Sequence, residues 1–170
     1  MKNVVLIGMP GAGKSTIGVL LAKTLLCDFT DTDLIIQNTC KKSLCDIIEE
    51  SGTDGFLKTE NDIICSCDFC GCVIATGGSA VYGEQAMKKL KENSTVVYLK
   101  LPVGELKRRL ADIRTRGVAM KNGTTIDELY AERSPLYEKY ADITLDCSGL
   151  TAEQCVNSLF ERLSGFPTEK

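Results

Sequence analysis

The amino-acid sequence predicts an α/β protein with a parallel β-sheet that is covered by helices on both faces. Short apolar runs alternate with longer helical patterns along the whole chain, and this alternation is typical of parallel sheets. The first run, Val4–Ile7, contains no polar residue, as expected for a strand buried on both faces. No repeat, linker or low-complexity tract divides the 170 residues, so we expect one domain over residues 1–170.

The expected strands are short and mostly apolar. They lie at residues 4–7, around Phe29 up to residue 31, and at 72–75, 96–99 and 143–145. The expected helices lie at residues 14–26, 43–50, 53–64 and 105–110, and a last one begins after residue 151. The first helix carries an apolar stripe at residues 17, 20, 21 and 25, which is the spacing of one helical face.

Capping residues mark where three of these helices begin. Ser43 is followed three residues later by Asp46, and Thr151 by Gln154, which is the spacing of a capping box. Pro102 stands where a proline opens the fourth helix. These signals set the N-terminal boundaries of the helices more firmly than the apolar pattern does.

The composition excludes several classes of protein. The chain is 44% apolar and 25% charged, which excludes a disordered chain. Twenty basic and 23 acidic residues give a net charge of −3, which argues against a nucleic-acid-binding protein. The absence of histidine rules out a histidine base or metal ligand. No apolar run reaches the length of about eighteen residues that a membrane span needs. We therefore expect a cytoplasmic protein with no membrane or nucleic-acid partner.

Nine cysteines, an odd number without an export signal, predict free thiols in a reducing compartment. Four of them lie in the segment Cys65-Ser66-Cys67-Asp68-Phe69-Cys70-Gly71-Cys72. Four thiolates can hold Zn²⁺, but here one short turn would have to wrap the ion alone. We expect Cys65 and Cys72 to be buried by packing, and a metal or redox role stays open as the alternative.

A phosphate-binding loop follows the first strand. Gly8-Met9-Pro10-Gly11-Ala12-Gly13-Lys14-Ser15 fits the pattern G-x-x-x-x-G-K-[ST] at every fixed position, between a buried strand and an amphipathic helix. Backbone N–H groups of such a loop and the helix N-terminus bind phosphate oxygens. We expect a nucleoside triphosphate to contact Gly11, Ala12, Gly13, Lys14, Ser15 and Thr16. Lys14 would bind the β- and γ-phosphates, and the Ser15 hydroxyl would ligate Mg²⁺.

Two carboxylates follow the second expected strand. Asp31 and Asp33 lie at the sheet edge where α/β proteins bind their ligands. One could hold Mg²⁺ through water, and the other could accept a proton from a substrate hydroxyl. A turn followed by a helix N-cap explains the same residues equally well.

Four motifs in chain order resemble the shikimate kinase family. They are the phosphate loop extended through Thr16-Ile17-Gly18, Asp31-Thr32-Asp33, Ala75-Thr76-Gly77-Gly78, and Arg133-Ser134-Pro135-Leu136-Tyr137. The resemblance covers residues 4 to about 146. It implies a three-layer P-loop kinase fold with a five-stranded parallel sheet, an acceptor-binding region at about 32–65 and a lid at about 111–124.

The implied reaction is the ATP- and Mg²⁺-dependent phosphorylation of the 3-hydroxyl of shikimate, a step of aromatic amino-acid biosynthesis, by a monomeric enzyme. By the resemblance, Asp33 is the base, Asp31 lies near Mg²⁺ through water, and Lys14 and Arg116 act on the phosphates. The same resemblance places Arg109 on the adenine and Arg133 on the carboxylate of the substrate. Gly77 and Gly78, with Ser79 after them, form the substrate loop. Independently, Lys107, Arg108, Arg109, Arg114, Arg116 and Lys121 give the lid region a basic excess.

Two residues depart from the family pattern. Leu57 stands where the family has an arginine that binds the carboxylate, and Ser79 replaces a third glycine. A hydrogen bond to a charged group contributes about 1.5–3 kcal/mol, so the loss of the arginine weakens carboxylate binding about 10- to 150-fold. Leu57 is either a packing residue or a sign of another acceptor. A kinase for gluconate or a similar hydroxy acid, and a non-catalytic nucleotide-binding module with a cysteine cluster, are the alternatives.

Overall fold

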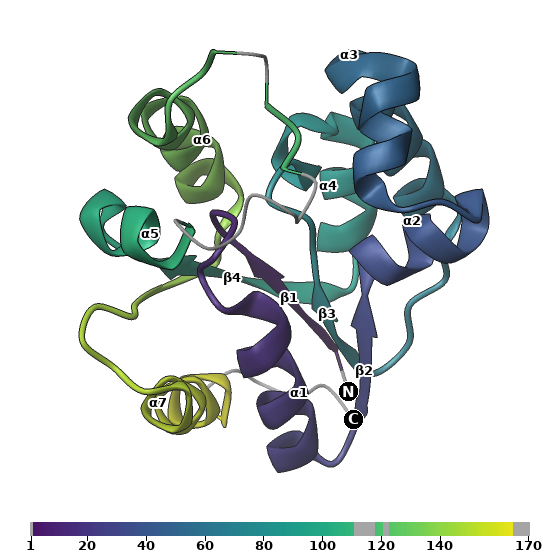
Figure 1. The fold of residues 1–170 in the computed structure, drawn as a ribbon. Coiled ribbons are helices and arrows are strands. Elements are labelled where there is room, and N and C mark those ends of the chain that lie inside the picture. Colours follow the sequence, from purple (N-terminus) through teal and green to yellow (C-terminus); the bar gives the residue numbers. More distant parts are fainter. Residues whose placement is uncertain (1, 111–117, 121–122, 165–170) are drawn as a thin grey trace.

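The described residues form a five-stranded parallel sheet with helices on both faces (Figure 1). The computed structural model describes residues 2–110, 118–120 and 123–164. The strands are β1 (Asn3–Ile7), β2 (Asp28–Asp31), β3 (Cys72–Ala75), β4 (Ser94–Lys100) and β5 (Ile143–Asp146), in the sheet order β2-β3-β1-β4-β5. The predicted fold class is confirmed.

Helices cover both faces of the sheet because the crossover from β1 to β2 runs in the opposite direction to the later crossovers. α1 (Lys14–Leu25) connects β1 to β2, whereas α4 (Glu84–Lys91) connects β3 to β4 the other way across the sheet. Right-handed crossovers in opposite directions place their helices on opposite faces. α7 (Ala152–Ser164) lies beside α1 (Figure 1), and α5 (Val103–Leu110) and α6 (Ile126–Tyr140) lie between β4 and β5 in the chain.

The region predicted at about 32–65 folds into α2 (Thr32–Cys40) and α3 (Leu44–Ser66). Gly52 breaks α3 with a backbone φ of 71° and ψ of 173°, so the two helices predicted at 43–50 and 53–64 are separate in backbone conformation. Ser43 caps the first of them with the predicted capping box to Asp46. After β3, a single 3-10 turn, η1 (Ala80–Tyr82), continues the glycine-containing loop.

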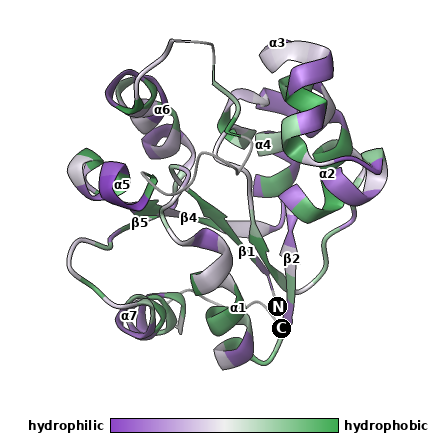
Figure 2. Ribbon diagram, viewed as in Figure 1, coloured by the Kyte–Doolittle hydropathy of each residue, from purple (hydrophilic) through white to green (hydrophobic). Residues whose placement is uncertain are grey.

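The core lies between the sheet and its helices. β1 and the middle of β4 are hydrophobic, whereas the edge strand β2 is more hydrophilic (Figure 2). A second, smaller apolar cluster is formed by residues of α2 and α3 together with Ala119; its buried members are Ile36, Ile47, Phe56 and Ala119. No helix among the described residues is long and apolar enough to cross a bilayer.

Candidate active site

The phosphate loop joins the carboxyl end of β1 to the N-terminus of α1. Gly13 is the N-cap of α1 and has a φ of 91°, a left-handed conformation that glycine adopts without strain. The Lys14 side chain is only 8% exposed, and its Nζ donates hydrogen bonds to the carbonyl oxygens of Gly8 at 2.8 Å and Met9 at 3.0 Å. Burial lowers the pKa of Lys14 to about 8. The carbonyl groups of the phosphate loop therefore hold the Lys14 ammonium group inside the loop, where phosphates would bind.

Asp31 connects this loop to the end of β2. The Ser15 hydroxyl donates a 2.6 Å hydrogen bond to Asp31 Oδ2. The other oxygen of Asp31 accepts from the backbone N–H of Asp33 at 3.0 Å, which makes Asp31 the N-cap of α2. The N-cap interpretation of Asp31 is thus confirmed, and its role near Mg²⁺ stays a prediction. A hydroxyl and a carboxylate in contact are hard oxygen donors of the kind that suit Mg²⁺.

Asp33 lies in the first turn of α2, two residues after Asp31, and lines a pocket. Burial, with the nearby Asp31 carboxylate, raises the pKa of Asp33 to about 6, and the positive charge of Lys14 opposes the rise. A carboxyl group with a pKa near neutral pH is suited to accepting a proton from a bound hydroxyl.

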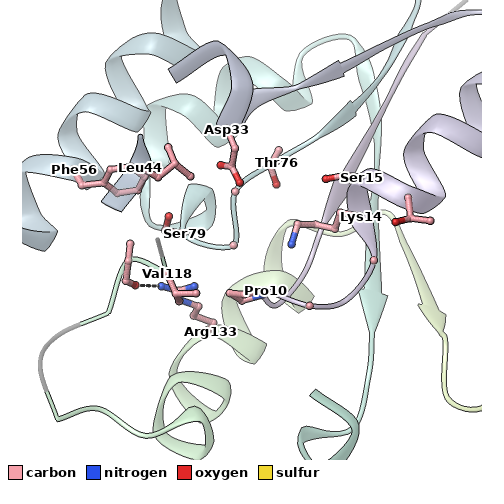
Figure 3. Close-up of a pocket in the computed structure, with 16 residues that line it drawn as sticks. Pro10, Lys14, Ser15, Asp33, Leu44, Phe56, Thr76, Ser79, Val118 and Arg133 are labelled. Carbon is pink, nitrogen blue, oxygen red and sulfur yellow. Dashed lines mark hydrogen bonds between the residues drawn. The ribbon is translucent and has the colours of Figure 1, made fainter. Parts of the chain in front are cut away.

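The pocket has a volume of about 280 Å³ and lies at the carboxyl ends of β1, β2 and β3. Figure 3 shows Asp33 and Arg133 on opposite sides of it, with Lys14 facing it from the phosphate loop. One wall of the pocket is apolar and consists of Leu44, Phe56, Val118 and Ala119. The predicted site residues that line the pocket are Gly11, Gly13, Lys14, Ser15, Thr16, Asp33, Gly77, Gly78, Ser79 and Arg133.

Three predicted residues lie beside the pocket without lining it. Asp31 lies behind Ser15, as described above. The Ala12 side chain is buried, and its N–H donates to the carbonyl of Met9 within the loop. Arg109 Nη1 donates to the carbonyl of Gly11 at 3.3 Å, so this arginine does reach the phosphate loop from α5. Arg116 and most of the lid predicted at 111–124 lie outside the described residues.

Arg133 is a buried arginine, 1% exposed, in the middle of α6. Its Nη2 donates to the carbonyl of Ala119, and its Nε donates to the hydroxyl of Tyr82 at 3.3 Å. Its guanidinium carbon lies 5.1 Å from the centre of the Tyr82 ring. One turn further along α6, the Tyr137 hydroxyl donates to the carbonyl of Gly78 at 2.6 Å. The helix thus fixes both the arginine and the loop that faces it.

Glu60 is a buried carboxyl group that the sequence analysis did not assign to the site. It is 2% exposed, its Oε2 accepts a 2.7 Å hydrogen bond from the Ser79 hydroxyl, and its Oε1 has no hydrogen-bond partner among the described residues. Burial, with the charge of Asp33, raises the pKa of Glu60 to about 7, and the Ser79 hydrogen bond and Arg133 oppose the rise. The two carboxyl groups enclose Gly77, where a Cβ would lie against Glu60 Oε1 and 2.8 Å from Asp33 Oδ1.

A sequence signal for Glu60 exists. Phe56, Glu60 and Ile64 follow one another at four-residue spacing, and the first and last of them are apolar. Residues four apart lie on the same face of a helix, so this pattern indicates a glutamate on the buried face. The structure confirms that all three are buried.

Leu57 is half-buried and packs against the apolar cluster of Ile36, Ile47, Phe56 and Ala119. It does not line the pocket. The packing interpretation of Leu57 is therefore supported, and Lys14 and Arg133 are the cationic residues that line the pocket among the described part of the chain.

The four clustered cysteines have separate surroundings. Cys72 is buried as predicted, whereas Cys65 is only partly buried. The Cys67 thiol lies 3.2 Å from the carbonyl of Ile63, and the Cys72 thiol lies 3.8 Å from Asn3 Oδ1. Burial raises the pKa of both Cys67 and Cys72, which disfavours their thiolates. Over the described ranges, no group of three or more cysteine, aspartate or glutamate side chains is arranged to hold a metal ion.

Comparisons with known proteins agree with this geometry. A family model described as shikimate kinase matches residues 10–164. A shikimate kinase from Francisella philomiragia is 35% identical over 162 residues, which cover 93% of this chain and 92% of that protein.

Two solved structures are similar over almost their whole length. Shikimate kinase from Acinetobacter baumannii in complex with shikimate has a TM-score of 0.89 and 27% identity, covering 99% of this chain and 96% of that one. Shikimate kinase from Aquifex aeolicus has a TM-score of 0.80 and 30% identity, covering 96% of both chains. The predicted enzyme class is confirmed: the chain is an ATP- and Mg²⁺-dependent kinase, and it belongs to the shikimate kinase family.

Proposed function

We propose that this chain transfers the γ-phosphoryl group of ATP to the 3-hydroxyl group of shikimate. The observation that carries the proposal is the pocket, in which a phosphate loop, a carboxyl group of raised pKa and a buried arginine face one cavity. A triphosphate, a hydroxyl that must lose its proton and a carboxylate are the three groups that such a pocket accommodates together.

Lys14 and Asp33 have different roles in phosphoryl transfer. The bond between the γ-phosphorus and the β,γ-bridging oxygen breaks while the acceptor oxygen binds the γ-phosphorus, so negative charge moves toward ADP. Lys14 lies at the loop that holds the β- and γ-phosphates and neutralises this charge. Asp33 takes the proton of the acceptor hydroxyl, which its raised pKa favours.

Arg133 and the glycine loop orient the acceptor. The Arg133 guanidinium binds the carboxylate across the pocket from Asp33, while the small Gly77 and Gly78 let the acceptor approach the backbone. Arg109 contacts the adenine beside the loop, and Arg116 closes over the phosphates; both roles rest on the family resemblance.

Ser15 and Asp31 would hold Mg²⁺, the aspartate through a water molecule. Their side chains are in contact, and both offer hard oxygen atoms. A magnesium ion bound there neutralises phosphate charge during transfer. We also propose that the enzyme acts as a cytoplasmic monomer; sedimentation as a dimer would contradict this.

The function is tested by measuring ADP release from Mg-ATP with shikimate, quinate, gluconate or no acceptor. We expect strong stimulation by shikimate and little by the others. A second candidate, a kinase for another hydroxy acid such as gluconate, is favoured by Leu57, which puts an apolar side chain where a second carboxylate-binding arginine is expected. Stimulation by gluconate and not by shikimate would establish that candidate instead.

A further inference from the structure

Under the proposed function, Arg133 binds the acceptor's carboxylate with little help from other cations among the described residues. Lys14 and Arg133 are the cations lining the pocket in the part of the chain that the structure describes, and Lys14 faces the phosphates. Leu57 packs into an apolar cluster and offers no charge. The orientation of the Arg133 guanidinium therefore decides how well a carboxylate is bound.

Tyr82 lies against this guanidinium without reaching the pocket. The tyrosine ends η1, three residues after Ser79, and does not line the cavity. Its ring lies 5.1 Å from the guanidinium carbon, and its hydroxyl accepts a hydrogen bond from Arg133 Nε at 3.3 Å. The same hydroxyl donates to Glu132 Oε1 at 2.8 Å. The hydroxyl is thus held between two consecutive residues of α6.

These contacts leave one edge of the guanidinium directed at the glycine loop. Nε is held by Tyr82 and Nη2 by the carbonyl of Ala119. Nη1 lies 3.1 Å from where a Cβ on Gly78 would be, and Gly78 and Arg133 both line the pocket. A planar guanidinium fixed at two nitrogens has a fixed third edge, and carboxylate recognition depends on that geometry.

We propose that Tyr82 is a positioning residue for acceptor binding, which acts by holding the Arg133 guanidinium with its Nη1 edge toward the acceptor's carboxylate. This inference rests on the proposed function. Tyr82 itself does not line the pocket. Its removal consequently weakens acceptor binding and leaves ATP binding unchanged.

The test uses steady-state kinetics of the full-length enzyme with shikimate and Mg-ATP. Tyr82→Phe keeps the ring and loses the hydroxyl. We expect it to raise the KM for shikimate about 10-fold, which corresponds to the lower end of the free-energy range for a hydrogen bond to a charged group. Tyr82→Leu removes the ring as well and raises the KM further, by a factor of about 2–5. The KM for ATP stays within about twofold in both variants.

Matched controls separate positioning from a structural effect. Tyr140 has a cation–π contact of the same 5.1 Å with Lys139, so Tyr140→Leu removes an equivalent contact that lies outside the pocket. We expect its kinetics to match the wild type. In an Arg133→Lys background, the effect of Tyr82→Phe on the KM for shikimate falls below about twofold, because a lysine has no Nε–H to hold.

The outcomes are distinguishable. A wild-type enzyme that phosphorylates shikimate, with Tyr82 variants of unchanged KM for shikimate, overturns the positioning role alone. An equal effect of Tyr82→Phe in the Arg133→Lys background also overturns it. A wild type without activity on shikimate overturns the proposed function and this inference with it.

Discussion

Replacing Glu60 by glutamine tests the electrostatics of the acceptor region through the stability of the protein. Glu60 is 2% exposed, one of its oxygens has no partner within the described residues, and Asp33 adds negative charge nearby, whereas Ser79, Arg133 and Lys14 favour the ionised form. Burial dominates, so the pKa of Glu60 rises from 4.5 to about 7 on folding. The folded protein therefore binds this proton more tightly than the unfolded chain does.

The sign of the pH dependence follows from linkage. A carboxyl group with a raised pKa in the folded state stabilises the fold fully below pH 4.5, and this stabilisation is lost as the pH rises through 7. Each unit of difference in pKa corresponds to about 1.4 kcal/mol, so the loss amounts to roughly 3 kcal/mol. Glutamine has nearly the same shape and no charge, and it can still accept a hydrogen bond from Ser79.

Urea unfolding of both proteins between pH 5 and 8 measures the effect. We expect the free energy of unfolding of Glu60→Gln to approach that of the wild type near pH 5 and to exceed it by roughly 3 kcal/mol at pH 8. Glu49→Gln, which changes an exposed glutamate in the part of α3 before Gly52, serves as the control and shows no such trend. A difference between Glu60→Gln and wild type that stays constant across this pH range would refute the reasoning.

Three further substitutions address the other parts of the site. Lys14→Ala should lower kcat by about 10²–10³-fold with an unchanged far-ultraviolet circular dichroism spectrum, because the charge on the phosphates is no longer neutralised; near-wild-type turnover would remove Lys14 from that role. Asp33→Asn should abolish transfer while calorimetry still detects ATP binding, since the amide cannot take the proton; unchanged transfer would exclude Asp33 as the base. Ser79→Ala should lower the free energy of unfolding at pH 8 by about 1–3 kcal/mol, because it leaves Glu60 Oε2 without its donor; an unchanged urea midpoint would contradict the importance of that hydrogen bond.

The sheet was predictable from the sequence because its three central strands, β1, β3 and β4, contain short apolar runs that are buried on both faces. The phosphate loop was predictable because strand, loop and helix are consecutive in the chain. The break at Gly52 was also expected, since the sequence predicted separate helices at residues 43–50 and 53–64. These features all depend on neighbours in sequence, which a pattern records directly.

Three helices were not predicted, for reasons specific to each. α2 begins at Thr32, inside a motif that also fits a turn, so its start was open between two interpretations. α4 is rich in lysine and has few apolar residues to set a period. α6 contains Pro135, which lacks an N–H group and usually interrupts a helix. A capping box of Thr125 and Glu128 at the start of α6 is nevertheless a local helix signal.

The contacts within the site could not be read from the sequence. Ser15 and Asp31 are 16 positions apart, Glu60 and Ser79 are 19 apart, and Tyr82 and Arg133 are 51 apart. Such pairs are brought together by the order of strands in the sheet, which a single sequence does not specify. The interdependence of Ser79 and Glu60 in particular emerges only once η1, which Ser79 precedes, is placed beside α3.

Phosphorus NMR of the reaction mixture tests the central claim most directly. With wild-type enzyme, Mg-ATP and shikimate, we predict that the γ-phosphate signal of ATP disappears. An equal phosphomonoester signal, coupled to the proton on carbon 3 of shikimate, should take its place. Loss of the γ-phosphate without that signal, or no loss that depends on shikimate, would contradict the assignment of the pocket to this acceptor.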